Sequence, residues 1–337
     1  MTIASATSDA TTVELEFDDN RLLPQLFGSH NSHLARIEQE LEVELRSRGN
    51  AVTITGPAVA AEVARNVLSG LYSRLKQGAE IDPAEVDGAL RMAEAPALAE
   101  APGGNLLPED LAIQTRKRQI LPRSQRQAAY LEAIDNHDLV FGLGPAGTGK
   151  TYLAVAKAVE SLIRGEIDRI VLSRPAVEAG EQLGFLPGDM KDKVDPYLRP
   201  LYDALHDMLP GNQVAKKLDT GEIEIAPLAF MRGRTLSHSF VILDEAQNTT
   251  AVQMKMSLTR LGENARMVVT GDLSQVDLPG GAKSGLRDAV SVLKGVDGVA
   301  FVNFTEKDVI RHQLVSRIVK AYDTRDPAKS AKSAKSE

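Results

Sequence analysis

The chain has 337 residues, more than one typical domain, so two domains joined by a linker are expected. Hydrophobic residues make up 43% and aromatic residues 4%, which favours aliphatic cores such as those of helix-covered parallel sheets. The sequence has no cysteine, which excludes disulfides and thiolate zinc sites. A net charge of −7 argues against a nonspecific polyanion-binding protein. The N-terminal residues lack the pattern of a secretory signal, and we expect a cytoplasmic location.

The N-terminal part is predicted to form a small α+β domain over residues 13–77, after a disordered segment over 1–12. Period-two alternation predicts a first strand, helical spacing predicts two helices, and a hairpin and a longer helix follow. The element order is therefore β-α-α-β-β-α. Between the first two helices lies a short loop that consists of Gly28, Ser29, His30 and Asn31.

This order resembles that of the KH domain, whose G-x-x-G loop clamps the backbone of RNA. The resemblance implies that Gly28, Ser29, His30 and Asn31 bind RNA. Asn31 stands where the KH pattern has its second glycine; asparagine tolerates a left-handed conformation but adds bulk. The alternative is a small α+β packing domain that binds no RNA, since this part of the chain is not strongly basic.

Residues 78–110 are assigned to a linker that contains one helix near its start and ends in an Ala/Pro/Gly-rich stretch. A basic run over 116–118 either faces solvent or contacts nucleic acid. At the other end of the chain, residues 323–337 are rich in Pro, Ala, Lys and Ser, which predicts a disordered tail.

Residues 111–322 contain a phosphate-binding loop of the form G-x-x-x-x-G-K-[ST], between an expected strand and an expected helix. Glycines let backbone N–H groups approach phosphate oxygens, and the helix N-terminus adds partial positive charge. We expect Lys150 to reach the β and γ phosphates of ATP and Thr151 to hold Mg²⁺. The loop consists of Gly144, Pro145, Ala146, Gly147, Thr148, Gly149, Lys150 and Thr151.

The second half of this site follows an apolar run over 240–243, which predicts a buried strand. Asp244 and Glu245 come directly after it, at the carboxyl end, where open α/β sheets bind their ligands. We expect Asp244 to hold Mg²⁺ and Glu245 to orient the attacking water. The alternative is an acidic pair on the surface.

Two glutamines are candidates for reading the nucleotide. Residues 271–275 resemble the G-D-x-x-Q element of superfamily 1 helicases, which implies that Gln275 senses the γ-phosphate; the alternative is a polar cap on a strand end. Gln127 resembles the adenine-reading glutamine of the same superfamily, and Gln125 is the competing candidate. We expect Tyr130 to lie in the core.

Several arginines are candidates for contacts with phosphate. Arg174 follows an expected strand, and Arg232 and Arg234 flank a glycine; each either meets phosphates or forms a salt bridge. Arg311 near the start of an expected helix is a candidate arginine finger, with a structural salt bridge as the alternative.

Together, residues 13–76 and 110–322 resemble the PhoH-like family in the form that has an N-terminal KH-like domain. The runs 144–151, 184–188, 231–235 and 244–248 carry the resemblance. It implies an α/β fold with a RecA-like P-loop NTPase core and a parallel sheet, ATP and Mg²⁺ as cofactors, and ATPase activity. It further implies a role in the metabolism of RNA, ribosomal RNA included, and the endoribonuclease YbeY as a partner.

The number of nucleotide-binding cores bears on assembly and mechanism. Superfamily 1 helicases place ATP between two RecA-like domains, and this chain has one phosphate loop. We therefore expect a homo-oligomer, such as a hexameric ring, in which an arginine acts in trans. The leading hypothesis is an ATPase coupled to RNA remodelling or unwinding. The alternative is an ATP-gated adaptor that binds RNA or a nuclease without separating strands; a kinase that uses the same loop is a third reading.

Overall fold

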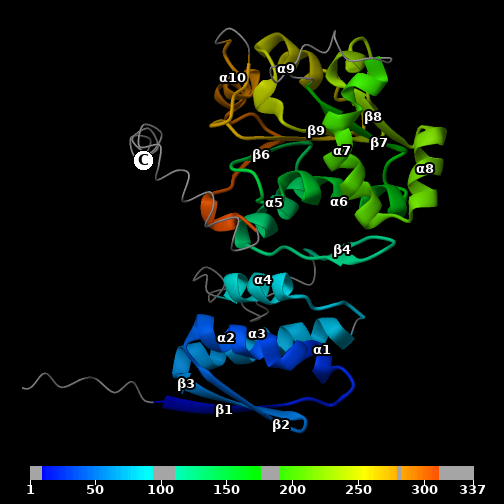
Figure 1. Ribbon diagram of the computed structural model, residues 1–337. Coiled ribbons are helices and arrows are strands. Elements are labelled where there is room, and N and C mark those ends of the chain that lie inside the picture. The colour runs from blue at the N-terminus through cyan, green and yellow to red at the C-terminus, as the bar shows by residue number, and fades with distance from the viewer. Residues whose placement is uncertain (1–9, 77, 94–110, 176–189, 279–281, 311–337) are drawn as a thin grey trace, which may run out of the picture.

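The computed structural model describes residues 10–76, 78–93, 111–175, 190–278 and 282–310. It consists of a small N-terminal domain and a larger domain, with helix α4 between them (Figure 1). The predicted Ala/Pro/Gly-rich stretch, the disordered tail, the run 184–188 and Arg311 lie outside the described residues.

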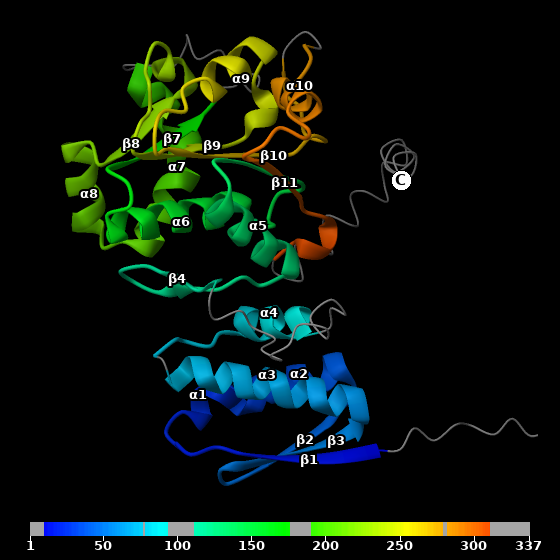
Figure 2. The same cartoon turned by 180° about the vertical axis from the view of Figure 1, so that it is seen from behind.

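The small domain has the predicted element order. A three-stranded antiparallel sheet in the order β1-β3-β2 is covered on one face by helices (Figure 2). The buried side chains of β3 are Val52 and Ile54, which alternate with Thr53 and Thr55, as a half-covered sheet requires. The elements are β1 (Ala10–Glu16), α1 (Leu23–Phe27), η1 (Ser29–Asn31), α2 (Ser32–Leu41), β2 (Glu44–Arg48), β3 (Ala51–Pro57) and α3 (Ala58–Lys76).

Two boundaries differ from the sequence prediction. Residues 10–12, predicted as disordered, belong to β1, because their pairing with β3 continues as far as Ala10 opposite Pro57. Helix α4 (Pro83–Ala93), predicted within a linker, instead adds Val86, Ala89 and Leu90 to the core of the small domain. Its amphipathic face is buried against α2 and α3, so it belongs to the small domain.

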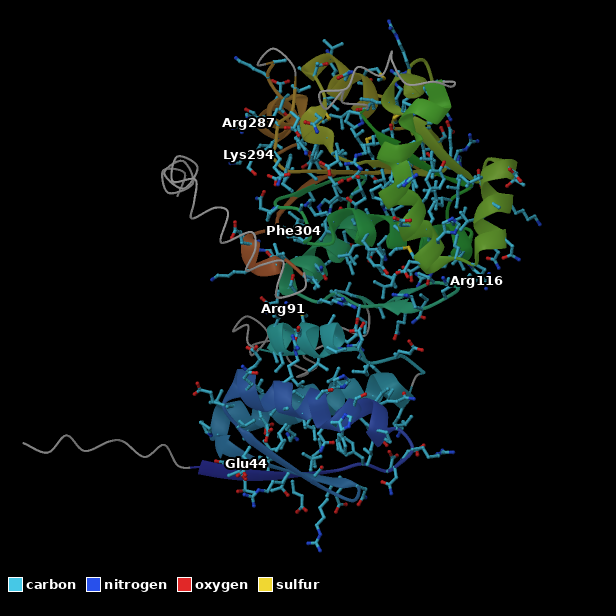
Figure 3. The ribbon with its side chains drawn as sticks, in the orientation of Figure 1. Glu44, Arg91, Arg116, Arg287, Lys294 and Phe304 are labelled. Carbon is cyan, nitrogen blue, oxygen red and sulfur yellow. The ribbon has the colours of Figure 1, made fainter. Side chains whose placement is uncertain are left out.

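Helix α4 also connects the two domains. Glu85 on α4 forms partly buried ion pairs with Arg74 of α3 and with Arg123 of the larger domain. Arg91, labelled between the domains in Figure 3, donates from Nε to the Arg123 carbonyl oxygen at 3.4 Å. The contacts named here between α4 and the larger domain are thus an ion pair and a hydrogen bond, both to Arg123.

The larger domain is built on a six-stranded parallel sheet, in the order β11-β6-β10-β9-β7-β8. Because helices cover both faces, the central strands are apolar along their length, as predicted. This confirms the α/β class and the parallel sheet. The strands are β6 (Leu139–Leu143), β7 (Arg169–Arg174), β8 (Ile223–Pro227), β9 (Ser239–Leu243), β10 (Arg266–Gly271) and β11 (Val299–Asn303).

Helices pack on the sheet in two layers (Figures 1 and 2). One layer, on the side of the small domain, contains α5 (Gln125–Asn136), α6 (Lys150–Arg164) and α7 (Met190–Met208), with α8 (Gly211–Thr220) beside β8. The other layer contains α9 (Ala251–Leu258) and α10 (Gly285–Val292). A two-stranded ribbon, β4 (Ile113–Gln114) and β5 (Gln119–Ile120), precedes α5.

The strand order sets the position of the site. After β6 the chain passes through α6 and crosses over to β7, leaving a gap that β10 and β9 fill later. Such a switch point opens a crevice at the carboxyl ends of the strands. Within the described residues, no helix has the length and apolar character needed to cross a membrane.

Candidate nucleotide-binding site

The predicted strand–loop–helix unit is confirmed around the phosphate loop. Strand β6 ends at Leu143 and α6 begins at Lys150. Gly147 and Gly149 have φ values of 84° and 83°, in the left-handed region that favours glycine. Gly144 has a φ of 136°, and a Cβ there would lie 2.4 Å from the carbonyl oxygen of Phe304. The glycines are thus required by the path of the backbone.

Lys150 lies within the curve of this loop. Its Nζ donates to the carbonyl oxygens of Gly144 and Pro145, both at 2.8 Å, and to Thr148 Oγ1 at 3.3 Å. The first N–H groups of α6 have no partner within the helix, and the helix dipole points its positive end at the same space. Backbone, helix and ammonium therefore create a site for an anion such as a phosphate chain.

A cavity of about 240 Å³ opens beside the loop. Among the described residues, those predicted to bind Mg²⁺ and phosphate or to act in hydrolysis line this cavity: Lys150, Thr151, Asp244, Glu245 and Gln275. They come from the ends of β6, β9 and β10, which lie next to one another or one strand apart. The sequence prediction that these segments form one site is consistent with this arrangement.

Asp244 lies at the centre of the site and is largely buried. Its Oδ1 accepts hydrogen bonds from Thr151 Oγ1 at 2.6 Å and from Thr270 Oγ1 at 2.7 Å. Asp272 Oδ2, also at the cavity, is buried without a hydrogen-bond partner among the described residues. The carboxylate and hydroxyl oxygens of Asp244 and Thr151 are the hard ligands that Mg²⁺ prefers, so the residues fit this ion.

The ligand set is small, which matches a nucleotide-bound ion. In the described part of the chain, no three His, Asp or Glu side chains are grouped to hold a metal. Mg²⁺ in nucleotide sites typically uses one or two protein ligands and takes the others from phosphates and water.

Glu245 lies at the rim of the cavity in a left-handed conformation, with φ of 51°. Its Oε1 is 3.2 Å from Arg174 Nη2, and its Oε2 accepts a hydrogen bond from Gln247 Nε2 at 2.5 Å. Gln247 Oε1 in turn accepts from the Asp272 backbone N–H at 3.1 Å. Gln247 therefore ties Glu245 to the loop that carries Gln275.

The candidate adenine readers, Gln127 and Gln125, do not line the cavity that contains Lys150, Asp244 and Glu245. Gln127 is buried on α5; its Nε2 donates to the Thr148 carbonyl oxygen at 2.9 Å and its Oε1 accepts from the Arg123 N–H at 2.7 Å. Both amide atoms thus hold protein backbone, and contact with adenine stays a prediction. Gln125 Nε2 is buried without a hydrogen-bond partner among the described residues, so Gln125 remains the competing candidate.

Tyr130 lies in the core beneath the site, as expected, and is fully buried. Burial raises the pKa of its hydroxyl well above the ordinary value, and the negative charge of Asp244 adds to the effect. A Cβ on Gly142 of β6 would lie within 3.0 Å of this ring, so the strand and the tyrosine fit closely. Tyr130 is therefore a neutral core residue beneath Asp244.

The loop over residues 28–31, which the resemblance to KH domains implies as the RNA contact, lies in the small domain and does not line this cavity. Gly28 has a φ of 72°, and His30 and Asn31 have φ of 54° and 59°. Ser29, His30 and Asn31 are exposed. A Cβ on Gly28 would lie 2.6 Å from Ser32 Oγ, so the loop needs a glycine at its start. RNA binding there stays a prediction.

Sequence reasoning gave no role to Thr270 or Gln247 and left the role of Arg174 open. Arg174, predicted either to meet phosphates or to form a salt bridge, pairs with the acids of this site, with Nη1 3.9 Å from Asp244 Oδ2. Thr270 and Gln247 position Asp244 and Glu245 by hydrogen bonds. Gln247 lies in the run 244–248 and Thr270 directly precedes the run 271–275, so closeness to these motifs is the sequence signal that could have identified them.

The parallel sheet with its switch point, the phosphate loop on β6 and the carboxylates on β9 define a P-loop nucleotide-binding protein. Residues 119–323 match the family described as PhoH-like protein. The chain belongs to this family.

Related sequences extend the match over most of the chain. It is 49% identical to the PhoH-like protein of Bacillus subtilis (strain 168) over 298 residues, which cover 88% of this chain and 93% of that protein. It is 50% identical to the PhoH-like protein of Mycobacterium tuberculosis (strain H37Rv) over 306 residues, or 89% and 85% of the two chains. The similarity to the SWI2/SNF2 ATPase core of Sulfolobus solfataricus covers 56% of this chain and 45% of the other, at 13% identity and a TM-score of 0.32.

Proposed function

We propose that this protein hydrolyses ATP in a Mg²⁺-dependent reaction and couples hydrolysis to the remodelling or unwinding of RNA. The observation that carries the ATPase proposal is the hydrogen bond of 2.6 Å from Thr151 to Asp244. It joins the phosphate loop to the carboxylate strand, two segments 93 residues apart in the sequence. These are the two halves that a magnesium-nucleotide site requires.

Each residue has a role that follows from its position. Lys150, now bonded to the loop carbonyl oxygens, would exchange these for the β and γ phosphate oxygens. Thr151 and Asp244 would hold Mg²⁺, which offsets charge on the phosphates. Glu245, at the open side of the cavity, would orient a water for attack on the γ phosphorus and accept its proton.

The network around Glu245 would report the state of the γ-phosphate. Gln275 lines the same cavity, and its N–H donates to the Asp272 carbonyl oxygen at 3.2 Å. Because Gln247 joins the Asp272 N–H to Glu245, movement of the 272–275 loop would shift Glu245 as well. Hydrolysis and loop movement would thus be coupled.

The RNA part of the proposal is supported by the resemblance of the small domain to KH domains. That resemblance supplies Gly28, Ser29, His30 and Asn31 as contacts with the RNA backbone.

The endoribonuclease partner, implied by the family resemblance, and an oligomeric ring, expected from the single phosphate loop, belong to the same proposal. A ring predicts a multiple of the monomer mass in sedimentation with ATP and RNA; a monomer alone would contradict it.

The ATP-gated adaptor is the second candidate, and one structural path favours it. Gln127 holds the Thr148 carbonyl oxygen with one amide atom and the Arg123 N–H with the other. The Arg123 side chain pairs with Glu85, which also pairs with Arg74 of the small domain. A change in the phosphate loop could therefore reach the small domain without any strand separation.

A direct test compares steady-state ATP hydrolysis with and without single-stranded RNA. For the coupled ATPase we expect RNA to stimulate turnover, and a duplex with a single-stranded tail to be unwound. For the adaptor we expect nucleotide-dependent RNA affinity without unwinding. Glu245→Gln should retain ATP binding and lose turnover; normal turnover in this variant would refute the assignment of Glu245.

A further inference from the structure

A second surface at the carboxyl edge of the sheet is not part of the nucleotide cavity. It consists of Phe230, Arg232 and Arg234, on the 3-10 helix η5 (Leu228–Met231) and the loop that follows β8. We call it the Phe230 loop. In the sheet register Arg174 pairs with Pro227, and Ser173 pairs with Leu243. The loop therefore begins two strand spacings from Asp244, roughly 10 Å across the sheet.

Phe230 is an unusual side chain for this position. It is 57% exposed, while the other large hydrophobic side chains exposed in the described residues are valines. Arg232, two residues on, is also exposed, and no ion pair involves it among the described residues. An exposed aromatic ring and an exposed guanidinium are thus two residues apart in the sequence. Both lie on the loop after β8, at the edge of the sheet where ligands of such sheets bind.

The backbone that carries these side chains is fixed. Leu228 and Met231 are buried in the core on the α9 side of the sheet. Arg234 forms a two-bond ion pair with Glu224 of β8, at 2.5 and 2.7 Å, and its carbonyl oxygen accepts from Arg260 Nη1 at 3.0 Å. The ring of Phe230 is therefore presented on a rigid support, which lowers the entropic cost of binding.

The turn between Arg232 and Arg234 also fixes where the two side chains lie. Gly233 has a φ of 76°, with open space where a Cβ would be. The left-handed turn lets Arg234 fold back to Glu224 while Arg232 stays in solvent. One arginine anchors the loop and the other is available.

We propose that the Phe230 loop binds single-stranded RNA, with a base stacked on Phe230 and a phosphate held by Arg232; this rests on the proposed RNA-coupled function. A ring face accepts any base, and single-stranded nucleic acid is bound by such aromatic platforms beside cationic groups. An arginine guanidinium suits phosphate better than an ammonium does, because its planar donors match two oxygens. A double-stranded ligand does not offer its base faces to such a ring.

The location explains how RNA could affect hydrolysis. Arg174 at the end of β7 lies between the Phe230 loop on β8 and the carboxylates on β9. It contacts Glu245 at 3.2 Å. A polyanion on the Phe230 loop would attract the Arg174 guanidinium and change its hold on Glu245.

The test is fluorescence anisotropy of labelled oligouridine binding to the full chain, with Phe230→Ala, Phe230→Tyr and Arg232→Ala. Val292→Ala, at an exposed valine of α10, is the matched control. We expect Phe230→Ala to weaken binding about 5- to 150-fold, from the usual contribution of one stacked base. Phe230→Tyr and Val292→Ala should bind like the unmodified chain. Arg232→Ala should reduce the dependence of affinity on salt.

The outcomes separate this inference from the proposed function. Hydrolysis without RNA should be unchanged in Phe230→Ala. If the unmodified chain binds RNA and Phe230→Ala binds it equally, the Phe230 loop is not the site, and the proposed function stands. If RNA binds through Phe230 while Lys150→Ala has no effect on ATP turnover, the ATPase assignment fails and the RNA site stands. A loss of oligomer mass in Phe230→Ala with unchanged RNA affinity would make the loop a contact between subunits and overturn the inference.

Discussion

Replacement of Gln127 by alanine tests the observed structure of the phosphate loop. The side chain is 3% exposed and makes two hydrogen bonds, to the Thr148 carbonyl oxygen and from the Arg123 N–H. Gln127→Ala leaves both backbone groups without these partners, one of them buried. Each such loss costs about 1–2 kcal/mol, so we expect the free energy of unfolding to fall by about 2–4 kcal/mol.

For a domain of this size, that loss lowers the midpoint of thermal unfolding by about 5–15 °C. The assay is calorimetry with and without nucleotide, combined with titrations of ATP and GTP. Because the variant loosens Thr148 of the phosphate loop, we expect the affinities for ATP and GTP to fall by similar factors. Gln125→Ala, which removes an amide whose Nε2 has no partner among the described residues, is the control and should unfold near the unmodified chain. Unchanged stability of Gln127→Ala together with a selective loss of ATP binding would refute this reasoning and support adenine reading.

Further predictions concern Asp244, the domain interface and the glycine that begins the phosphate loop. Thr270→Val removes a hydrogen bond to the charged Asp244 and should lower the Mg²⁺-dependent rate of ATP hydrolysis about tenfold or more. The rate is measured as a function of Mg²⁺ concentration, and a curve equal to that of the unmodified chain would contradict this. Glu85→Gln weakens the partly buried pairs with Arg74 and Arg123 and should increase proteolytic cleavage between the domains without abolishing ATP binding; unchanged cleavage would contradict the interface role. Gly144→Ala forces a Cβ against the Phe304 carbonyl oxygen and should destabilise the larger domain by about 2–5 kcal/mol in denaturant unfolding, whereas Gly165→Ala, at a left-handed position with open space, should cost only about 1–2 kcal/mol.

Local spacing was sufficient to predict the centre of the site. The loop from Gly144 to Thr151 has its lysine and threonine at fixed offsets from glycines that the backbone requires. Asp244 follows an apolar run of the kind that strands covered on both faces show. These signals lie within short segments, and their strand–loop–helix context is readable from the same residues.

The other site residues depend on strand order, which short segments do not encode. Thr270 reaches Asp244 because β10 lies between β6 and β9, and Arg174 reaches both acids because β7 is the next strand. The two hydrogen bonds that the Gln127 amide forms with the backbone of Arg123 and Thr148 likewise result from tertiary packing. Helix α4 shows the same limit, because its amphipathic pattern indicates a buried face but not the domain that buries it.

The most direct test of ATP hydrolysis at this site is a steady-state assay of the full chain with Mg²⁺, measured beside Lys150→Ala and with Mg²⁺ chelated. We expect turnover to be lost on chelation and in Lys150→Ala, with the protein still folded by circular dichroism. Turnover that survives Lys150→Ala would contradict the claim that this phosphate loop is the catalytic site.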